Sequence, residues 1–340
     1  MSERLDRAIA EMARADVDLL VLGREGNARY VSGANRLSLA GTRAFAPGCA
    51  VVRRTGAVHL LSITDEGVPA DVPPDRLYPL SWNPANLVGA VAAAPGASGA
   101  RRIGVDGLTP MFEQLLAGAF PDAEIVDGEA LMRRVRRVKS PDDVAAIRAA
   151  VDVVERALAA VVDALQPGVT ERELLGVFEE ARCALGATVP AFQGSFCVVD
   201  DGRSRRFVRD RAVEDRDLVA MRAGALVDGW EGSLARTLAC GDAWSMREAE
   251  SRRWHESWPH LVDRCRPGTR VDDLRAEDGV TLHGVGLGYE GLAGDEVLEP
   301  GMLVELELEL DGVVGADMLL VTAHEPDLLT RFPDRSTDPT

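Results

Sequence analysis

Hydrophobic positions at helical and alternating spacing divide the chain into two α/β parts. In the first part, Leu5, Ile9 and Met12 recur on one face of residues 2–14, which predicts an amphipathic helix. Helices are also expected over 85–94 and 109–119. Short apolar runs bounded by Gly- and Pro-rich turns predict the strands of a small sheet; these runs are VDLLVL, AVV, AVHLLS, RIGVD and AEIVD.

A helix-start signal marks the beginning of the second part. Ser140 is a suitable N-cap, Pro141 suits the first helical position, and apolar residues then recur at helical spacing as far as Leu158. The basic run RRVRRVK just before it is typical of a solvated helix face or an interdomain ion-pair strip. The predicted division is a first domain over 1–135, a second over 136–330 and a flexible tail over 331–340.

Two similar segments about one hundred residues apart indicate an internal duplication in the second domain. They are QPGVTERELL at 166–175 and RPGTRVDDLR at 266–275, each with turn and cap residues before an acidic helix start. The second copy leaves little room for its helix before Leu282. Further along, Glu305, Glu307 and Glu309 alternate with leucines, a pattern that ordinarily means a strand with one solvated face.

Composition narrows the class of protein. With 340 residues and 46% apolar content, the chain is long enough for two domains with buried cores. Its formal net charge of −17 argues against a general nucleic-acid binder. No apolar run approaches the roughly 18 residues that span a bilayer and the N-terminus lacks a signal-peptide pattern, so we expect a cytoplasmic protein without membrane contact. Five scattered cysteines indicate buried, reduced thiols.

Three stretches carry the candidate chemistry: RAGALVDGWEGSLARTLACG (222–241), LHGVGLGYE (282–290) and EPGMLVELELELDGVVGADMLLVT (299–322). They resemble the creatinase, Xaa-Pro aminopeptidase and methionine aminopeptidase family. NARYVSG at 27–33 and VKSPDDVAAIRAA after the boundary are similar to its N-terminal and entry segments. The resemblance implies an α/β (α+β) protein, with a creatinase-like N-terminal domain and a "pita-bread" domain of pseudo-twofold duplication. It also implies a homodimer, in which Arg43 and Phe45 are candidates to cover the partner's site.

The family's metal ligands are mostly replaced in this chain. The family holds two divalent metals with two Asp, one His and two Glu, and the matching positions here are Arg222, Ser233, His283, Glu307 and Ala316. A guanidinium offers no lone pair and repels a dication, so we expect no metal and no other cofactor. A buried Arg222 would need Glu307 or a ligand as its partner.

Shifting the alignment with the family by one residue is not expected to restore the metal ligands. It would recruit Asp228, Glu231 or Asp317, and a one-residue slip along a strand turns a side chain to the opposite face. Asp317 is therefore expected outside the pocket.

The surviving frame and the substituted positions give a candidate substrate site. Where the family has substrate-contacting histidines, this chain offers Arg209 and Tyr289. The predicted substrate-binding residues are Arg222, Arg209, Ser233, Trp230 and Tyr289, and the predicted catalytic residues are His283 and Glu307.

Three functions compete at this stage. The leading hypothesis is a metal-independent enzyme, in which His283 is the acid/base, Glu307 orients it and Arg222 binds a small, polar, anionic substrate during hydrolysis or elimination at a C–N or related bond. The creatinase branch shows that this fold can work without metal. The second hypothesis is a non-catalytic relative that binds a ligand or a protein. A metal-dependent Xaa-Pro aminopeptidase is disfavoured by the lost ligands.

Overall fold

The computed structural model describes residues 3–35 and 47–332, and the chain separates into two compact units, Met1–Arg136 and Arg137–Thr340. Arg43 and Phe45, the residues predicted to reach a partner's site, lie outside the described residues, as does the predicted tail from 333 onward. The division falls next to the boundary expected from the sequence.

The first unit is a mixed sheet of six strands in the order β4-β3-β2-β1-β5-β6. Strand β1 pairs antiparallel with β2 and parallel with β5. The helices and strands predicted here are confirmed, whereas the helices α2 and α5, the 3-10 helix η1 and the short strand β4 were not predicted. The elements are α1 (Glu3–Arg14), β1 (Leu19–Leu22), α2 (Glu25–Ser32), β2 (Cys49–Val52), β3 (Ala57–Leu61), the 3-10 helix η1 (Pro74–Arg76), β4 (Leu77–Tyr78), α3 (Pro84–Ala93), β5 (Arg102–Val105), α4 (Pro110–Ala119), β6 (Glu124–Asp127) and α5 (Gly128–Arg137).

The basic run at the boundary forms the end of α5 and is not simply a solvated face. Arg136 is buried and donates from Nη1 to Asn27 Oδ1 at 2.7 Å, within the first unit. Arg137 pairs with Glu299 at 3.0 Å, within the second. Arg136 and Arg137 therefore each have a structural partner within their own unit.

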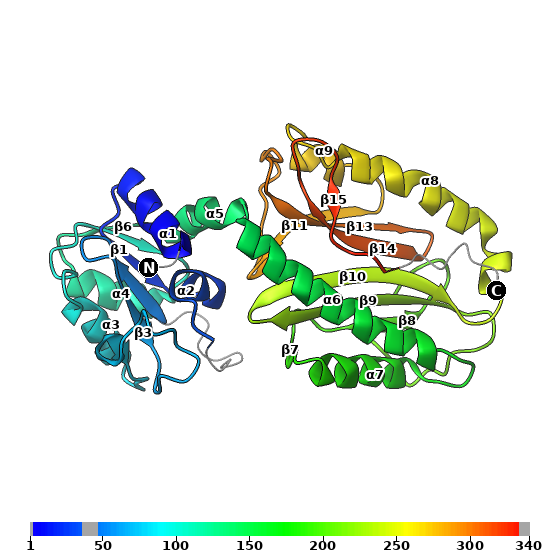
Figure 1. Cartoon of the computed structure of the whole chain (residues 1–340), viewed down its shortest axis with the longest axis horizontal. Coiled ribbons are helices and arrows are strands. Elements are labelled where there is room, and N and C mark those ends of the chain that lie inside the picture. Colours follow the sequence, from blue (N-terminus) through cyan, green and yellow to red (C-terminus); the bar gives the residue numbers. More distant parts are fainter. Residues whose placement is uncertain (1–2, 36–46, 333–340) are drawn as a thin grey trace. The chain divides into compact units, whose positions relative to one another are not determined.

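The second unit is built on a nine-stranded sheet (Figure 1). Its main path runs β12-β11-β13-β14-β10-β9-β7, with β15 paired to β14 and β8 paired to β9. The elements are α6 (Pro141–Ala164), α7 (Glu171–Ala184), β7 (Val189–Pro190), β8 (Ser195–Val198), β9 (Leu218–Val227), β10 (Trp230–Ala239), η2 (Ala243–Met246), α8 (Glu248–Arg264), α9 (Val271–Arg275), β11 (Val280–Gly286), β12 (Gly288–Glu290), β13 (Leu303–Leu310), β14 (Val313–Leu320) and β15 (Asp327–Leu328).

The predicted duplication is present as a repeated pattern of backbone hydrogen bonds. Gly168 and Gly268 have left-handed φ angles of 96° and 93°. The amide of Gly168 donates to the carbonyl of Val213, and the amide of Gly268 donates to the carbonyl of Leu298. Both copies then enter a helix, but α9 is only five residues long where α7 has fourteen, as the short connection to Leu282 led us to expect.

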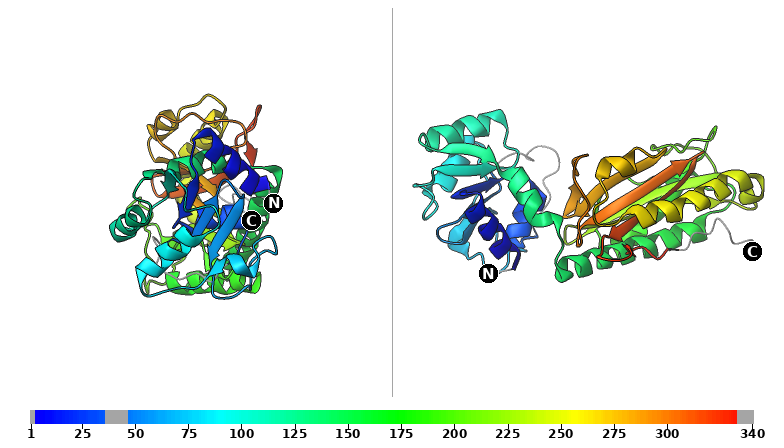
Figure 2. Two further views of the ribbon diagram at one scale, coloured as in Figure 1. Left: turned by 90° about the vertical axis from the view of Figure 1, so that its left-hand side faces the viewer. Right: turned by 90° about the horizontal axis from the view of Figure 1, so that it is seen from above.

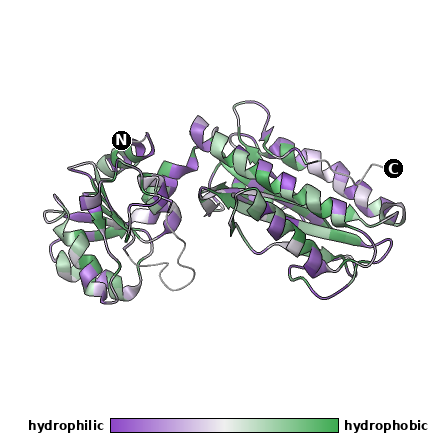
Figure 3. Ribbon diagram, turned by 60° about the horizontal axis from the view of Figure 1, so that its bottom comes forward, coloured by the Kyte–Doolittle hydropathy of each residue, from purple (hydrophilic) through white to green (hydrophobic). Residues whose placement is uncertain are grey.

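The helices cover one face of the strands, and the opposite face carries both charged residues and small apolar residues such as Ala235 and Ala316. Helix α6 packs on β9 and β10, and α7 packs on α6 and β8 (Figures 1 and 2). Helix α8 packs on β13 and β14, and α9 packs on β11. Apolar residues run along much of the strands in both units (Figure 3). On β10, Leu234 and Leu238 belong to the core under α6. Because strand side chains alternate, odd-numbered residues such as Glu231 and Ser233 lie on the opposite face.

The start of α6 agrees with the cap read from the sequence. Ser140 accepts a hydrogen bond from the Asp143 amide, and Asp143 accepts one from the Ser140 amide, which forms a capping box. All five cysteines are free, and four are buried while Cys183 is exposed. Within the described residues, no helix combines the length and the hydropathy required to cross a bilayer.

The close approach of α6 to β10 requires a glycine at 232. A Cβ there would lie less than 3.0 Å from the backbone carbonyl of Ala150. We expect Gly232→Ala to lower the free energy of unfolding by about 1–3 kcal/mol, because the helix must move away from the strand. Chemical denaturation would measure this change. The matched control is Gly176→Ala on the open side of α7, which should raise stability by up to about 1 kcal/mol; equal effects of the two substitutions would contradict the packing argument.

Candidate functional site

Two clusters of charged residues lie on the strand face opposite the helices. The Arg222 cluster consists of Ser204, Arg206, Arg222, Glu307 and Glu309. The His283 cluster consists of Glu231, His283 and Glu305.

A buried ion pair forms the centre of the Arg222 cluster. Arg222 donates from Nε to Glu307 Oε2 at 3.0 Å and from Nη2 to Glu307 Oε1 at 3.2 Å. The same Nη2 donates to Glu309 at 2.6 Å and to Ser204 Oγ at 3.0 Å. Arg206 adds a second guanidinium on Glu307 at 2.9 Å. Because Arg222 and Glu307 are only 3% and 7% exposed, their charges neutralise each other away from water.

The strand register explains how Arg222 reaches Glu307. Arg222 on β9 is opposite Ala235 on β10, Ala235 is opposite Ala316 on β14, and Ala316 is opposite Glu307 on β13. Directly opposed residues share a face of the sheet. Two alanines therefore separate the charged residues and leave the space that the long arginine crosses. A longer or acidic side chain at 316 would fill that space.

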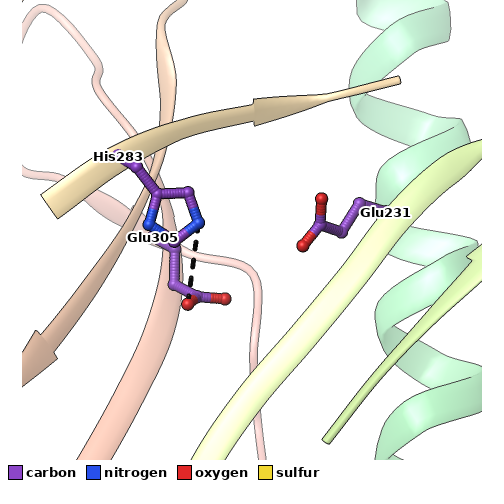
Figure 4. A group of neighbouring side chains, drawn as sticks. All are labelled: Glu231, His283 and Glu305. Carbon is purple, nitrogen blue, oxygen red and sulfur yellow. Dashed lines mark ion pairs between the residues drawn. The ribbon is translucent and has the colours of Figure 1, made fainter. Parts of the chain in front are cut away.

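The His283 cluster brings together three strands. His283 on β11 and Glu305 on β13 are register partners, and His283 Nε2 lies 3.8 Å from Glu305 Oε1. Figure 4 shows the Glu231 carboxylate, carried by β10, pointing across toward both. One ligand atom from each residue lies within 4.8 Å of the other two. Across residues 3–35 and 47–332, no other group of three or more His, Cys, Asp and Glu side chains converges in this way.

Glu231 is a buried carboxylate without a hydrogen bond. It is 4% exposed, and among the described residues no donor reaches its carboxylate. Strand alternation does not turn Glu231 away from the site, contrary to the expectation from the sequence. Glu231 lies two residues from Ser233, not one, so both side chains have the same face of β10.

Glu305 is also buried, contrary to the solvated face expected for this strand. Ser233 Oγ donates to Glu305 Oε2, and the apolar residues Leu306 and Leu308 fill the core on the other side of β13. Glu307 is buried as well, whereas Glu309 is partly exposed. The glutamate face is therefore an interior face for two of its three members.

Burial shifts the proton affinities of all three residues in the His283 cluster. Burial, followed by repulsion from Glu305 and Glu290, raises the pKa of Glu231 to about 8. Burial is also the largest effect on Glu305 and raises its pKa to about 7 despite the hydrogen bond from Ser233. Burial lowers the pKa of His283, although Glu307 opposes the shift. At neutral pH the imidazole is therefore uncharged and keeps a lone pair.

Two further contacts surround this cluster. Tyr289 on β12 stacks on His283 with ring centroids 5.1 Å apart, and its own side chain is largely exposed. Lys139 pairs with Glu290 at 2.8 Å. The stacking limits the orientation of the imidazole ring. The ion pair balances the charge of Glu290 with that of Lys139.

Two predicted substrate-binding residues lie outside both clusters. Arg209 forms ion pairs with Glu171 at 2.6 Å and Asp200 at 2.7 Å. Trp230 is buried at the start of β10, on the face that alternation assigns to Leu234. Asp317 pairs with Arg236 at 2.6 Å and belongs to neither cluster, although its charge contributes to the raised pKa of Glu305.

Surface hollows in the second unit are separate from both clusters. One of about 480 Å³ is lined by Arg266, Pro267, Ala323, His324 and Glu325. Another of about 280 Å³ is lined by residues of α6 together with Arg331 and Phe332.

The residues present do not fit a pair of metal ions at the family's positions. Arg222 occupies both oxygens of Glu307 with its own donors, Ala316 offers no ligand atom, and Ser233 donates to Glu305. The His283 cluster does fit one divalent cation. Two carboxylates and a neutral imidazole are ligands that transition metals accept, and Glu231 has no competing partner among the described residues.

Several residues of these clusters were not found from the sequence. Ser204 and Arg206 come from the loop before β9, where spacing pointed to Arg209. Glu231 and Glu305 each lie two residues before a frame position, on the same face. Residues two positions apart on a strand share a face, so counting back two residues from Ser233 and from Glu307 leads to both.

Comparison with known proteins places the chain within a family. Residues 145–323, more than half of the chain, match metallopeptidase family M24, and residues 4–138 match the creatinase/prolidase N-terminal domain. A curated relative, the Xaa-Pro dipeptidase of Pyrococcus horikoshii, is 22% identical over 97% of both chains.

Solved structures agree on the fold. A prolidase from P. horikoshii superimposes with a TM-score of 0.79 at 20% identity, covering 98% of this chain and 99% of the other. The Xaa-Pro dipeptidase from Bacillus anthracis gives 0.81 at 19% identity, covering 98% of each chain. The chain belongs to metallopeptidase family M24, with a creatinase-like N-terminal domain and a pita-bread domain.

Proposed function

We propose that this chain is a hydrolase that cleaves a C–N bond in a small peptide-like substrate, with one divalent cation held by Glu231, His283 and Glu305. The observation that carries the proposal is the Glu231 carboxylate, which is buried, unpartnered among the described residues and directed at His283 and Glu305. A buried carboxylate without a donor is costly, and a bound cation removes that cost.

The chain's own residues have distinct roles in this proposal. A cation in this position would polarise the carbonyl group of the substrate and would lower the pKa of a bound water toward neutral pH. Ser233 orients Glu305 by donating to one of its oxygens, and Tyr289 holds the imidazole plane by stacking. Outer contacts of this kind fix ligand geometry.

The substrate class follows from the relatives and from the remaining cations. The names of the relatives, Xaa-Pro dipeptidase and prolidase, support a small peptide-like substrate. Arg222 has Nε and Nη2 engaged, so within the described structure only its buried Nη1 is without a partner. Arg206 has a side chain that is 55% exposed, and it is the better candidate for a substrate carboxylate.

A metal-free reaction is the second candidate. It is favoured by the 3.8 Å contact between His283 Nε2 and Glu305 Oε1, which would let Glu305 orient a general acid/base histidine. In that role Glu305 takes the place assigned to Glu307 from the sequence, because Glu307 is engaged by Arg222. The two candidates differ in one respect: the metal-free enzyme keeps its turnover after chelation, and the metal enzyme does not. A non-catalytic protein would show no turnover in either state.

The ligand set can be tested by substitution and metal analysis. Glu231→Gln and His283→Ala should weaken Zn²⁺ or Mn²⁺ binding on the order of 100-fold or more, since each removes a direct ligand. They should lower Xaa-Pro dipeptide hydrolysis together with the metal content. Calorimetry and elemental analysis of the purified protein measure the binding.

Two exposed residues of α8 provide matched controls for that experiment. Glu256→Gln and His260→Ala make the same chemical changes away from the clusters and should leave binding unchanged. A wild-type protein that binds no divalent cation, or variants that bind as tightly as wild type, would refute the proposed ligand set.

The pH dependence of stability provides a separate prediction for the metal-free protein. With the pKa of Glu231 near 8, the folded protein keeps a proton that the unfolded chain releases near pH 4.5. The stability that this bound proton contributes is therefore fully present below about pH 4.5 and is lost as the pH rises toward 8. In EDTA, Glu231→Gln should match wild type near pH 5 and become more stable than it by up to about 1.4 kcal/mol per pH unit above that. Thermal denaturation at several pH values measures this difference, and parallel curves for the two proteins would contradict it.

A further inference from the structure

The Arg222 cluster is electrically balanced without any added ion. It contains the guanidinium groups of Arg206 and Arg222 and the carboxylates of Glu307 and Glu309. Arg222 uses a two-pronged contact on Glu307, the strongest geometry that a guanidinium and a carboxylate can form. This cluster therefore offers no carboxylate oxygen that lacks a positive partner nearby.

The Arg222 cluster lies where the family holds its metal ions. Arg222 and Glu307 occupy two of the family's metal-ligand positions, and the row Arg222, Ala235, Ala316, Glu307 crosses four adjacent strands on one face. The guanidinium lies where a ligand carboxylate and an ion would otherwise be. The alanine at 316 removes a negative charge and also provides room for the arginine.

We propose that the Arg222 guanidinium is a built-in cation that replaces one metal ion of the two-metal arrangement, so that this protein holds a single divalent cation. That the remaining count is one rests on the proposed function. The exclusion of an ion from the Arg222 cluster does not, because it depends only on the contacts of Arg222.

Removal of the guanidinium should open a second cation site. Without Arg222, the carboxylates of Glu307 and Glu309 are balanced only by Arg206, so the cluster has a net charge of −1. Ser204 Oγ, which lies within hydrogen-bond distance of Glu309, adds a third oxygen. Oxygen ligands of this kind suit a hard divalent ion such as Mn²⁺. Arg222→Ala and the more conservative Arg222→Gln both produce this arrangement.

The test is the Mn²⁺ stoichiometry of the full-length protein by calorimetry and elemental analysis. We expect one equivalent for wild type and two for Arg222→Ala. Arg222→Gln, which keeps a side chain able to hydrogen-bond Glu307, should also bind two and serves if the alanine variant fails to fold. Arg222→Lys, which retains the charge, should bind one. Two equivalents in wild type, or no gain over wild type in both Arg222→Ala and Arg222→Gln, would overturn the inference.

A control and a second background separate the possible causes. Arg182→Ala removes another buried, ion-paired arginine of the same unit and should add no Mn²⁺ site. In a Glu231→Gln background, Arg222→Ala should still add one equivalent relative to Glu231→Gln alone. If wild type binds none and Arg222→Ala binds one, the proposed function fails and the built-in cation stands.

Discussion

The buried ion pair between Arg222 and Glu307 constrains everything else on this face of the sheet. Charges removed from water cost several kcal/mol each unless they are paired and hydrogen-bonded. Arg222 meets that requirement through Glu307, Glu309 and Ser204, and the two alanines between the strands permit its reach. Because the charge of Arg222 is already matched, it is not available in full to a substrate anion. The ion pair also fixes strand β9 against strand β13 across the strands that lie between them.

The His283 cluster has the opposite electrostatic character. Neither Glu231 nor Glu305 forms an ion pair with a lysine or arginine of the described residues, and the nearby Lys139 is engaged by Glu290. Burial then leaves two ways to remove the excess negative charge. A proton does so on each carboxyl group, which is the reason for their raised pKa values, and a divalent cation does so for both at once. The same side chains thus have two alternative neutral states.

Much of the fold and part of the site could be predicted from the sequence, for physical reasons that differ between residues. Periodicity and cap chemistry located most helices and strands, and the family frames located His283, Arg222 and Glu307. The expectation that a buried Arg222 would pair with Glu307 followed from the cost of an unpaired charge and is confirmed.

Glu231 was missed because alternation was applied to a slip of one residue, whereas it lies two residues from Ser233. Glu305 was assigned to solvent because alternation shows which residues share a face but not whether other strands enclose that face. Ser204 and Arg206 lie in a loop, where no period relates spacing to position.

Charge balance connects the substitutions into one set. The family's two Asp and two Glu carry four negative charges, which two divalent metals neutralise. In this chain the same positions keep one carboxylate, Glu307, and gain one cation, Arg222, so they sum to zero without metal. The added carboxylates of Glu231 and Glu305 carry two negative charges when ionised, which is the charge that one divalent cation neutralises. A loss of ligands through drift would leave an arbitrary remainder at the family's positions. Instead, those positions and the His283 cluster are each neutral when the protein holds a single ion, so the changes at 222, 233 and 316 are consistent with a site rebuilt around one metal.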